Sequence, residues 1–304
     1  MTNFKFTIQF DKFQNIAQRF TFLPGINIVY GASGVGKSFF LSCIEGKSLN
    51  QSYNFQIDHK NRAFVYHRIF QNPDNQIIGR SVRGELSFSG ECKGKPVSEL
   101  QMIIESGLDQ LPDTIDSYMN PGLLSGGEKE LLNLTTAMQS SPDILIIDDG
   151  LSFLSSENKL IAVNWLRAWA NNTKSIVVWA TSEKNDLEFG DTKWVLDLDS
   201  FKKTEYVKPE HYDSIHIPEG SLSLKWNDVS FKYDNSRRIY SDLSLSLDDC
   251  RSVGLLGSNG SGKTTFAGLC FGYLKPQKGQ AVLSINGIVD LKIGYVDQFP
   301  EHLI

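Results

Sequence analysis

Two glycine-rich segments contain residue types that can bind a triphosphate chain. Residues 31–38 (GASGVGKS) and 257–264 (GSNGSGKT) share the spacing G-x-x-x-x-G-K-[ST]. Glycine lets backbone N–H groups approach phosphate oxygens, lysine neutralises the terminal phosphates, and the final hydroxyl can bind Mg²⁺. The binding residues predicted in the two loops are Gly31, Ala32, Ser33, Gly34, Val35, Gly36, Lys37 and Ser38, and Gly257, Ser258, Asn259, Gly260, Ser261, Gly262, Lys263, Thr264 and Thr265.

Each phosphate loop needs a strand before it and a helix after it, because the helix N-terminus adds N–H donors and partial positive charge. Short apolar runs at residues 26–30 and 253–256 predict the two strands, and the apolar spacing from Ser38 onward predicts a helix. Residues 142–148 (PDILIID) predict a buried parallel strand that presents Asp148 at its C-terminal end. An alternating run from Leu222 predicts a new edge strand.

The chain contains an internal repeat. The two loops lie 226 residues apart. Gln71 ends the tripeptide IFQ, Gln298 ends the similar tripeptide VDQ, and these two glutamines lie 227 residues apart. The repeat predicts a first cassette over residues 1–203, a linker over 204–220 and the N-terminal part of a second cassette over 221–304. The first copy continues with motifs at Ser125 and Asp148, whose counterparts in the second copy would fall near positions 352 and 375. We therefore expect the second copy to be truncated after its glutamine.

The composition and the net charge of the chain argue against several classes of protein. The chain has 304 residues, is 40% hydrophobic and carries a net charge of −5, which gives no basic stripe and argues against nucleic acid as a partner. No apolar run reaches 18 residues, so no transmembrane helix is expected, and the N-terminus does not read as a signal peptide.

The motifs of the first copy follow the order found in the ATP-binding cassette (ABC) ATPases, which the chain therefore resembles. They are a phosphate loop, Gln71, residues 124–128 (LSGGE) and the strand that ends in Asp148. The resemblance covers residues 1–200 and 221–304. It implies an α/β P-loop NTPase fold with an ABC-type cassette, consisting of a mixed core sheet, an antiparallel edge sheet and a helical signature subdomain, followed by a partial second copy. It also implies ATP and Mg²⁺ as cofactors.

In such a cassette, ATP on one phosphate loop is closed over by the signature segment of a second cassette, in the same or another chain. The resemblance assigns the signature role to Ser125, Gly126, Gly127 and Glu128. It assigns Mg²⁺ binding to five other residues: Ser38, Thr264, Gln71, Gln298 and, through water, Asp148. Tyr233 corresponds to an aromatic that stacks on adenine, although a core tyrosine is the alternative. In the first copy the weaker candidates are Phe10 and Phe13.

Residues 69–79 (IFQNPDNQIIG) are similar to the ATPase subunits of energy-coupling-factor importers, which take up vitamins and metal ions. This implies a transmembrane permease subunit and a substrate-capture membrane subunit as partners, on the cytoplasmic face of the membrane. The alternatives are a generic cassette ATPase, a soluble ABC ATPase of DNA repair or translation, and a nucleotide-binding regulator or truncated product without turnover. Ser38 and Leu124 are 86 positions apart, and the segment between them lacks the sustained heptads of the coiled coil that repair members carry.

Three positions depart from the family pattern. Asp149 replaces the glutamate that polarises the attacking water, Ser182 replaces a histidine near the γ-phosphate, and Ser155 replaces an aspartate. A general base must reach its proton within about 2.6–3.2 Å, and the aspartate side chain is one methylene shorter. We therefore expect Asp149, Gln71 and Ser182 to form a degenerate catalytic set that binds ATP but hydrolyses it poorly.

Overall fold

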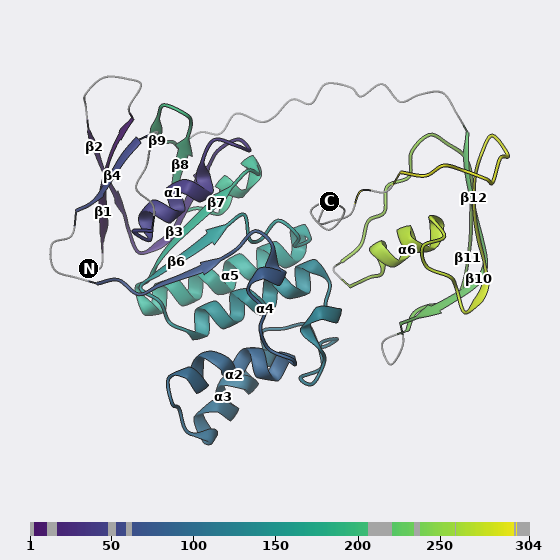
Figure 1. Cartoon of the computed structure of the whole chain (residues 1–304), viewed down its shortest axis with the longest axis horizontal. Coiled ribbons are helices and arrows are strands. Elements are labelled where there is room, and N and C mark those ends of the chain that lie inside the picture. Colours follow the sequence, from purple (N-terminus) through teal and green to yellow (C-terminus); the bar gives the residue numbers. More distant parts are fainter. Residues whose placement is uncertain are drawn as a thin grey trace. The chain divides into compact units, whose positions relative to one another are not determined.

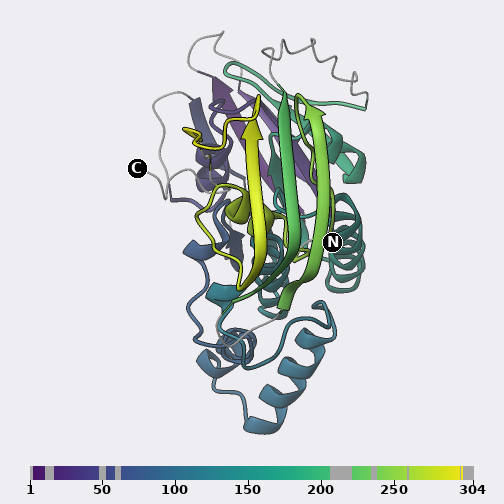
Figure 2. The same ribbon diagram turned by 90° about the vertical axis from the view of Figure 1, so that its right-hand side faces the viewer.

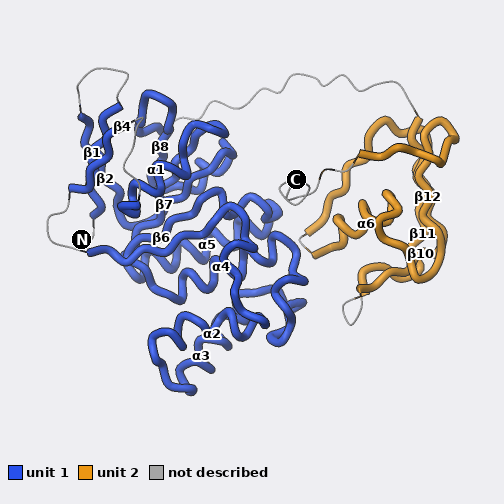
Figure 3. The backbone as a smooth tube through the Cα atoms, viewed as in Figure 1, with its two compact units in different colours: residues 1–210 blue, residues 211–304 orange. Residues whose placement is uncertain are grey.

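The computed structural model describes residues 3–10, 17–47, 53–58, 63–205, 221–233, 238–258, 260–294 and 296. The chain divides into two compact units, Met1–Glu210 and His211–Ile304, which Figure 3 colours blue and orange. The predicted linker 204–220 lies outside the described residues apart from its first two. Within the described part of the chain, no helix is both long enough and apolar enough to cross a membrane.

A six-stranded sheet forms the centre of the first unit (Figure 1). Its strand order is β5-β6-β7-β3-β8-β9, in which the first five strands are parallel and β9 is antiparallel to β8. The strands are β3 (Gly25–Tyr30), β5 (Tyr66–Ile69), β6 (Ile144–Asp148), β7 (Ile176–Thr181), β8 (Thr192–Leu196) and β9 (Phe201–Lys203). The strands expected at 26–30 and 142–148 are therefore present.

The central strands are buried on both faces, as their continuous apolar sequences require. Along β7, Val177 and Trp179 belong to one core cluster, whereas Ile176 and Val178 belong to the other. The first cluster includes residues of α4 (Gly126–Gln139), α5 (Ser156–Thr173), α2 (Val82–Cys92) and α3 (Val97–Leu108). The second includes residues of α1 (Lys37–Ile44) and of the antiparallel sheet β2-β1-β4.

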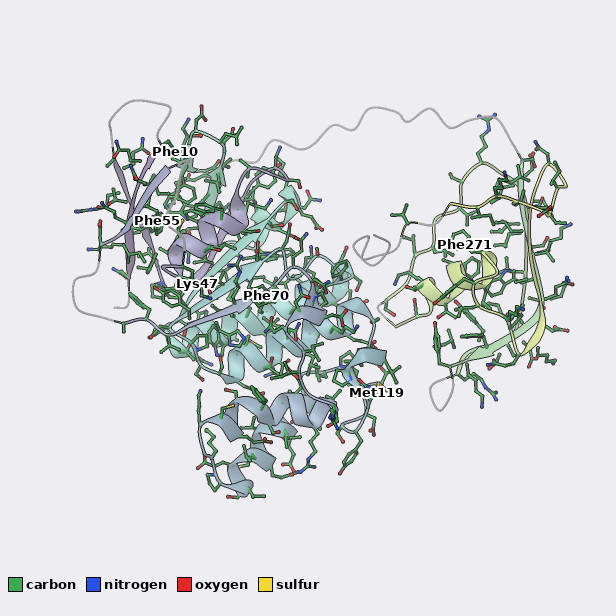
Figure 4. The ribbon with its side chains drawn as sticks, viewed as in Figure 1. Phe10, Lys47, Phe55, Phe70, Met119 and Phe271 are labelled. Carbon is green, nitrogen blue, oxygen red and sulfur yellow. The ribbon has the colours of Figure 1, made fainter. Side chains whose placement is uncertain are left out.

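The antiparallel sheet of the first unit consists of β1 (Phe4–Phe10), β2 (Gln18–Phe22) and β4 (Tyr53–Ile57). Its aromatic side chains pack against those of α1 and β9: the ring centroids of Phe6 and Phe40 lie 5.9 Å apart, and those of Phe20 and Phe201 lie 5.0 Å apart. Phe10 and Phe55, labelled in Figure 4, pack at the margin of this cluster. A mixed core sheet, an antiparallel edge sheet and a helical subdomain thus make up the cassette.

The second unit is built on an antiparallel sheet of order β11-β10-β12, whose three strands lie side by side in Figure 2. The strands are β10 (Leu222–Lys232), β11 (Arg238–Cys250) and β12 (Lys278–Ile285), and the helix α6 spans Lys263–Cys270. Trp226 stacks on Phe266 with ring centroids 4.4 Å apart, which joins β10 to α6. The edge strand expected from Leu222 is present.

The strand expected at residues 253–256 is absent. The segment is irregular and exposed, and Leu256 is 99% accessible. Its counterpart β3 is a strand because it pairs on both sides, with β7 and with β8. Among the described residues of the second unit, no strand is available to flank 253–256 in this way. An apolar run becomes a central strand only where neighbouring strands accept its hydrogen bonds.

Candidate functional site

The first phosphate loop connects β3 to α1. Gly34 and Gly36 have φ values of 81° and 98°, a left-handed conformation that glycine adopts without strain. A Cβ atom at either glycine would meet no heavy atom within 4 Å, so the outer side of the loop is open. Because the first N–H groups of α1 have no acceptor inside the helix, they are available to an anion at this opening.

The lysine of the loop is already placed beside this opening. Lys37 is buried, and its Nζ donates hydrogen bonds to the carbonyl oxygens of Gly31 at 2.9 Å and Ala32 at 3.2 Å. The ammonium group therefore lies across the loop that would enclose the phosphates. This geometry fits a triphosphate chain.

The described residues of the second phosphate loop repeat the lysine contacts and the glycine φ values of the first, although four of the eight loop residues differ in type. Lys263 Nζ donates to the carbonyl oxygens of Gly257 at 2.8 Å and Ser258 at 2.9 Å. Gly260 and Gly262 have φ values of 72° and 98°. Thr264 is exposed at the start of α6, as Ser38 is on α1. The predicted binding residue Asn259 and the predicted Mg²⁺ ligand Gln298 lie outside the described residues.

Two of the three Mg²⁺ ligands predicted in the first unit, Ser38 and Asp148, meet at the end of β6. Ser38 Oγ donates to Asp148 Oδ1 at 3.0 Å, which places a hydroxyl and a carboxylate together beside the phosphate loop. Oxygen donors of this kind suit Mg²⁺, and when bound the ion neutralises the phosphate charge. Gln71 is exposed just beyond the end of β5.

A basic residue that the sequence analysis missed also reaches this pair. Arg68 Nη2 lies 2.6 Å from Asp148 Oδ2, and Arg68 Nη1 lies 2.9 Å from Glu45 Oε2. The signal available in the sequence was an arginine three residues before Gln71, in a strand whose other residues are partly or fully buried.

The signature segment begins α4. Ser125 is the N-cap: its Oγ accepts a hydrogen bond from the Glu128 N–H at 3.4 Å, and its own backbone N–H donates to Glu128 Oε2 at 2.9 Å. This arrangement is a capping box, which stabilises the helix start. Gly126 and Gly127 are buried in the first turn. Four predicted residues thus form one rigid helix N-terminus within the first unit.

The helix α4 is also attached to the 3-10 turn η1 (Pro73–Asn75), which follows Gln71. Lys129 Nζ lies 2.6 Å from Asp74 Oδ1, and Asn133 Nδ2 donates to the Pro73 carbonyl at 3.0 Å. Phe70, labelled in Figure 4, precedes this turn at the end of β5. The helix α4 and the turn that follows Gln71 are therefore joined by one ion pair and one buried hydrogen bond.

Asp149 and Ser182, both predicted to belong to the catalytic set, contact each other. Ser182 Oγ donates to Asp149 Oδ2 at 2.7 Å, and the Ser182 backbone N–H donates to Asp149 Oδ1 at 3.2 Å. Asp149 has a φ of 53°, in the left-handed region where aspartate is tolerated better than most residues. The carboxylate expected to act on water is thus held by the side chain that replaces the histidine.

Ser155, the third departure, is the N-cap of α5, where its side chain accepts a hydrogen bond from the Asn158 N–H at 3.3 Å. Tyr233 lies beside the second loop, with its hydroxyl 3.1 Å from Thr265 Oγ1 and its ring edge-on to Phe231. Tyr233 is 41% exposed. Phe10 is partly buried in the aromatic cluster, and Phe13 lies outside the described residues.

Glu130 is a second residue that the sequence analysis missed. It is fully buried in α4, and both of its carboxylate oxygens accept from the Phe153 N–H, at 3.2 and 3.0 Å. It thereby holds the loop that follows Asp149. Burial raises the pKa of Glu130 to about 8, although hydrogen bonds from backbone N–H groups and the charge of Lys159 oppose the shift.

The raised pKa of Glu130 predicts a pH-dependent stability. Between the unfolded pKa near 4.5 and the folded pKa near 8, only the folded state keeps the proton, so the free energy of unfolding falls as pH rises. The Glu130→Gln variant keeps an acceptor oxygen but does not titrate. We expect it to lack this fall in the free energy of unfolding, which amounts to at most about 1.4 kcal/mol per pH unit. Urea unfolding of the two proteins between pH 5 and 7.5, followed by tryptophan fluorescence, measures this difference; parallel pH profiles would contradict it.

A glycine loop between a parallel strand and a helix, with a hydroxyl–carboxylate pair at the adjacent strand end, defines a P-loop nucleotide-binding protein. The family model described as ABC transporter matches residues 20–152 and 240–303. The chain therefore belongs to the ABC transporter family. The expected cassette fold and the expected cofactors, ATP and Mg²⁺, are confirmed by this membership together with the fit of the loop.

The chain is similar to several known proteins. It is 27% identical to the energy-coupling factor transporter ATP-binding protein EcfA1 of Streptococcus agalactiae, over 59% of this chain and 67% of that protein. A protein of Onion yellows phytoplasma named as an ABC transporter ATP-binding protein is 23% identical over 91% of this chain, which spans 63% of that relative. The structure of cbiO1 from Clostridium perfringens, part of the ABC transporter complex cbiONQ, has a TM-score of 0.55 at 17% identity and covers 66% of this chain and 88% of that one. This last likeness concerns the fold alone.

Proposed function

We propose that this chain is an ATP-binding subunit of an energy-coupling-factor-like importer, in which Mg·ATP binding and hydrolysis drive uptake of a vitamin, metal ion or other small solute. The observation that carries the proposal is the pair of phosphate loops with matching lysine geometry, Lys37 on Gly31 and Lys263 on Gly257. The similarity to EcfA1 supports the class of transporter.

The proposal includes the domain organisation and the partners. Residues 1–203 would be the first cassette and 221–304 part of a second, joined by the linker 204–220. The partners would be a transmembrane permease subunit, a substrate-capture membrane subunit and a second cassette, with the chain peripheral on the cytoplasmic face of the membrane. Large apolar side chains exposed beyond Gln71 and on α2 and α3, namely Ile78, Phe88 and Met102, support docking to an apolar partner.

The first nucleotide site is proposed to be slow. Asp149 accepts hydrogen bonds from Ser182 through both carboxylate oxygens, so the proposed general base would have to exchange one of these bonds to act on water. In an assembly with a complete second cassette, the faster site would pair the second phosphate loop with Ser125–Glu128. Lys263→Ala would then reduce turnover more than Lys37→Ala.

The purified chain is expected to bind Mg·ATP while turning over more slowly than about 1 s⁻¹, the lower end of typical enzymes. Calorimetry measures the binding and a coupled phosphate-release assay measures the turnover. Co-purification from membranes with an identified multi-span permease tests the transporter assignment. The second candidate function, a nucleotide-binding regulator, is favoured by the Asp149–Ser182 contact, and it predicts binding without any permease.

A further inference from the structure

His67 lies on β5, four residues before Gln71, and both of its ring nitrogens have hydrogen-bond partners. Nδ1 lies 3.0 Å from the Oγ atom of Ser140, the C-cap of α4, and Nε2 lies 3.2 Å from Gln76 Nε2 at the end of η1. The ring is partly buried. One side chain of β5 therefore connects the end of α4 to the end of the turn that follows Gln71.

The partners determine where the neutral ring carries its proton. Ser140 Oγ donates its only hydrogen to the Ala137 carbonyl at 2.7 Å, so toward His67 it can only accept. Nδ1 then carries the proton, and Nε2 accepts from the Gln76 amide N–H. The oxygen of the same amide, Gln76 Oε1, accepts from the Phe70 N–H at 3.4 Å. These hydrogen bonds are called the His67 network below.

The His67 network closes the segment 70–76. β5 is the outer strand of its sheet, and the Phe70 N–H lies just past the end of that strand. Gln76 is the C-cap of η1, and its own backbone N–H donates to the Pro73 carbonyl at 3.3 Å. The Gln76 side chain therefore ties the end of the segment to its start, with Gln71 in between.

A protonated ring cannot keep the His67 network. When both ring nitrogens carry hydrogens, Nε2 no longer accepts from the Gln76 amide N–H. If the amide turns over to offer its oxygen to the ring, its NH2 group faces the Phe70 N–H, and two donors meet. Either arrangement loses one hydrogen bond of the segment.

The surroundings of His67 favour the neutral ring. Burial lowers the pKa of His67 from its ordinary value of 6.5, and the charge of Lys93 lowers it further. Lys93 follows α2, and its Nζ donates to the Ser140 carbonyl at 2.9 Å. Three carboxylates on the elements around the ring have partners of their own: Glu91 with Ser87, Asp74 with Lys129, and Asp143 with the Val65 N–H. The network is therefore complete at pH 7 and is lost as the pH falls below 6.5.

We propose that His67 is a positioning residue for Gln71: the neutral ring holds the segment 70–76 through Gln76, and protonation releases this hold. The inference rests on the proposed function in one respect, because Gln71 is a predicted Mg²⁺ ligand and the segment sets its position. Binding of Mg·ATP to the first loop is therefore expected to weaken in acid by more than the titration of the nucleotide itself requires.

Two substitutions separate the titration of the ring from its shape. His67→Gln can place an amide oxygen where Nε2 lies, so it accepts from Gln76 but does not titrate. Gln76→Glu can accept from a protonated ring and from the Phe70 N–H at the same time, but it donates nothing to a neutral ring. Gln76→Glu is therefore expected to raise the pKa of His67 above that of the parent protein, by at least about tenfold in the proton-binding constant.

NMR of the full chain without nucleotide measures both effects. The imidazole signal that is absent from His67→Gln reports the pKa of His67. Amide hydrogen exchange of Phe70, compared with His67→Gln at each pH so that the chemical exchange rate cancels, reports the hold on the segment. Between pH 7 and pH 5, we expect Phe70 protection in the parent protein to fall by at least about threefold relative to His67→Gln. In Gln76→Glu it is expected not to fall.

Gln101→Glu is the matched control, because it introduces the same charge at a glutamine that bonds to Arg83 and Glu105 and not to His67. Its Phe70 protection and its His67 pKa should equal those of the parent protein. If Phe70 protection in the parent follows the same pH profile as in His67→Gln, and both proteins keep their tryptophan emission, the positioning role is overturned.

Calorimetry tests the consequence for nucleotide binding. In a Lys263→Ala background the first loop dominates, and between pH 7 and pH 5 the dissociation constant of Mg·ATP is expected to rise at least about threefold more with His67 present than with His67→Gln. The titration of the nucleotide is common to both proteins. An equal rise would contradict the link to Gln71. If neither protein binds Mg·ATP at pH 7, the proposed function fails, whereas the NMR result tests the His67 network by itself.

Discussion

Replacing Lys37 and Lys263 together by alanine is expected to weaken Mg·ATP binding by at least about 100-fold, or close to 3 kcal/mol. In each loop the ammonium group lies on carbonyls of its own loop, Lys37 on Gly31 at 2.9 Å and Lys263 on Gly257 at 2.8 Å. The group is therefore positioned before the nucleotide arrives. Each single replacement should remove one class of binding event in calorimetry and leave the other.

Lys47→Ala is the matched control for the lysine variants. Lys47, labelled in Figure 4, follows α1 and pairs its exposed ammonium group with Glu45, so its loss removes the same charge without touching a phosphate loop. Its effect on ATP binding should stay within about twofold, because the ammonium group is solvated and lies outside both loops. Equal affinities for the double variant and the parent protein would refute both phosphate sites.

Asp148→Ala is expected to lower the free energy of unfolding of the first unit by about 3 kcal/mol. The change removes a partner of Arg68 and of Ser38 in a place where the Asp148 and Arg68 side chains are 10% and 11% exposed. A guanidinium that loses one of two carboxylates in such a place keeps its charge with fewer compensating bonds. The loss of free energy of unfolding is therefore expected to exceed that caused by breaking a surface ion pair.

Urea unfolding measured by tryptophan fluorescence tests this cost. Because Trp226 is the one tryptophan of the second unit, a Trp226→Phe background restricts the signal to the first unit. Glu99→Ala serves as the control, since Glu99, in the first turn of α3, forms an exposed pair with Lys95, which precedes that helix, and its loss should cost about 0.5 kcal/mol or less. A loss below about 1 kcal/mol for Asp148→Ala would mean that the Arg68 contact contributes little in solution.

The features that the sequence predicted are those determined by local spacing. The glycines at 34 and 36, the start of α1 at Lys37 and the apolar run that ends at Asp148 all depend on residues within one element or its immediate neighbour. The run at 253–256 has the same local character, yet it is irregular. A central strand depends on partners distant in the chain, and a local pattern carries no information about whether they are present.

The contacts that the sequence did not predict depend on strand register. Arg68 and Asp148 are 80 residues apart and meet because β5 pairs with β6 so that Arg68 is opposite Ile146. Asp149 and Ser182 are 33 residues apart and meet because β6 pairs with β7 so that Asp148 is opposite Ala180. A shift of either register by one residue would separate these pairs.

The attachment of α4 to η1 has a mechanical consequence. The Lys129–Asp74 ion pair and the Asn133–Pro73 hydrogen bond connect η1, which follows Gln71, to the helix that begins at Ser125. A displacement of η1 would strain both contacts unless α4 moved with it. The position of the turn and the position of Ser125 are therefore expected to change together.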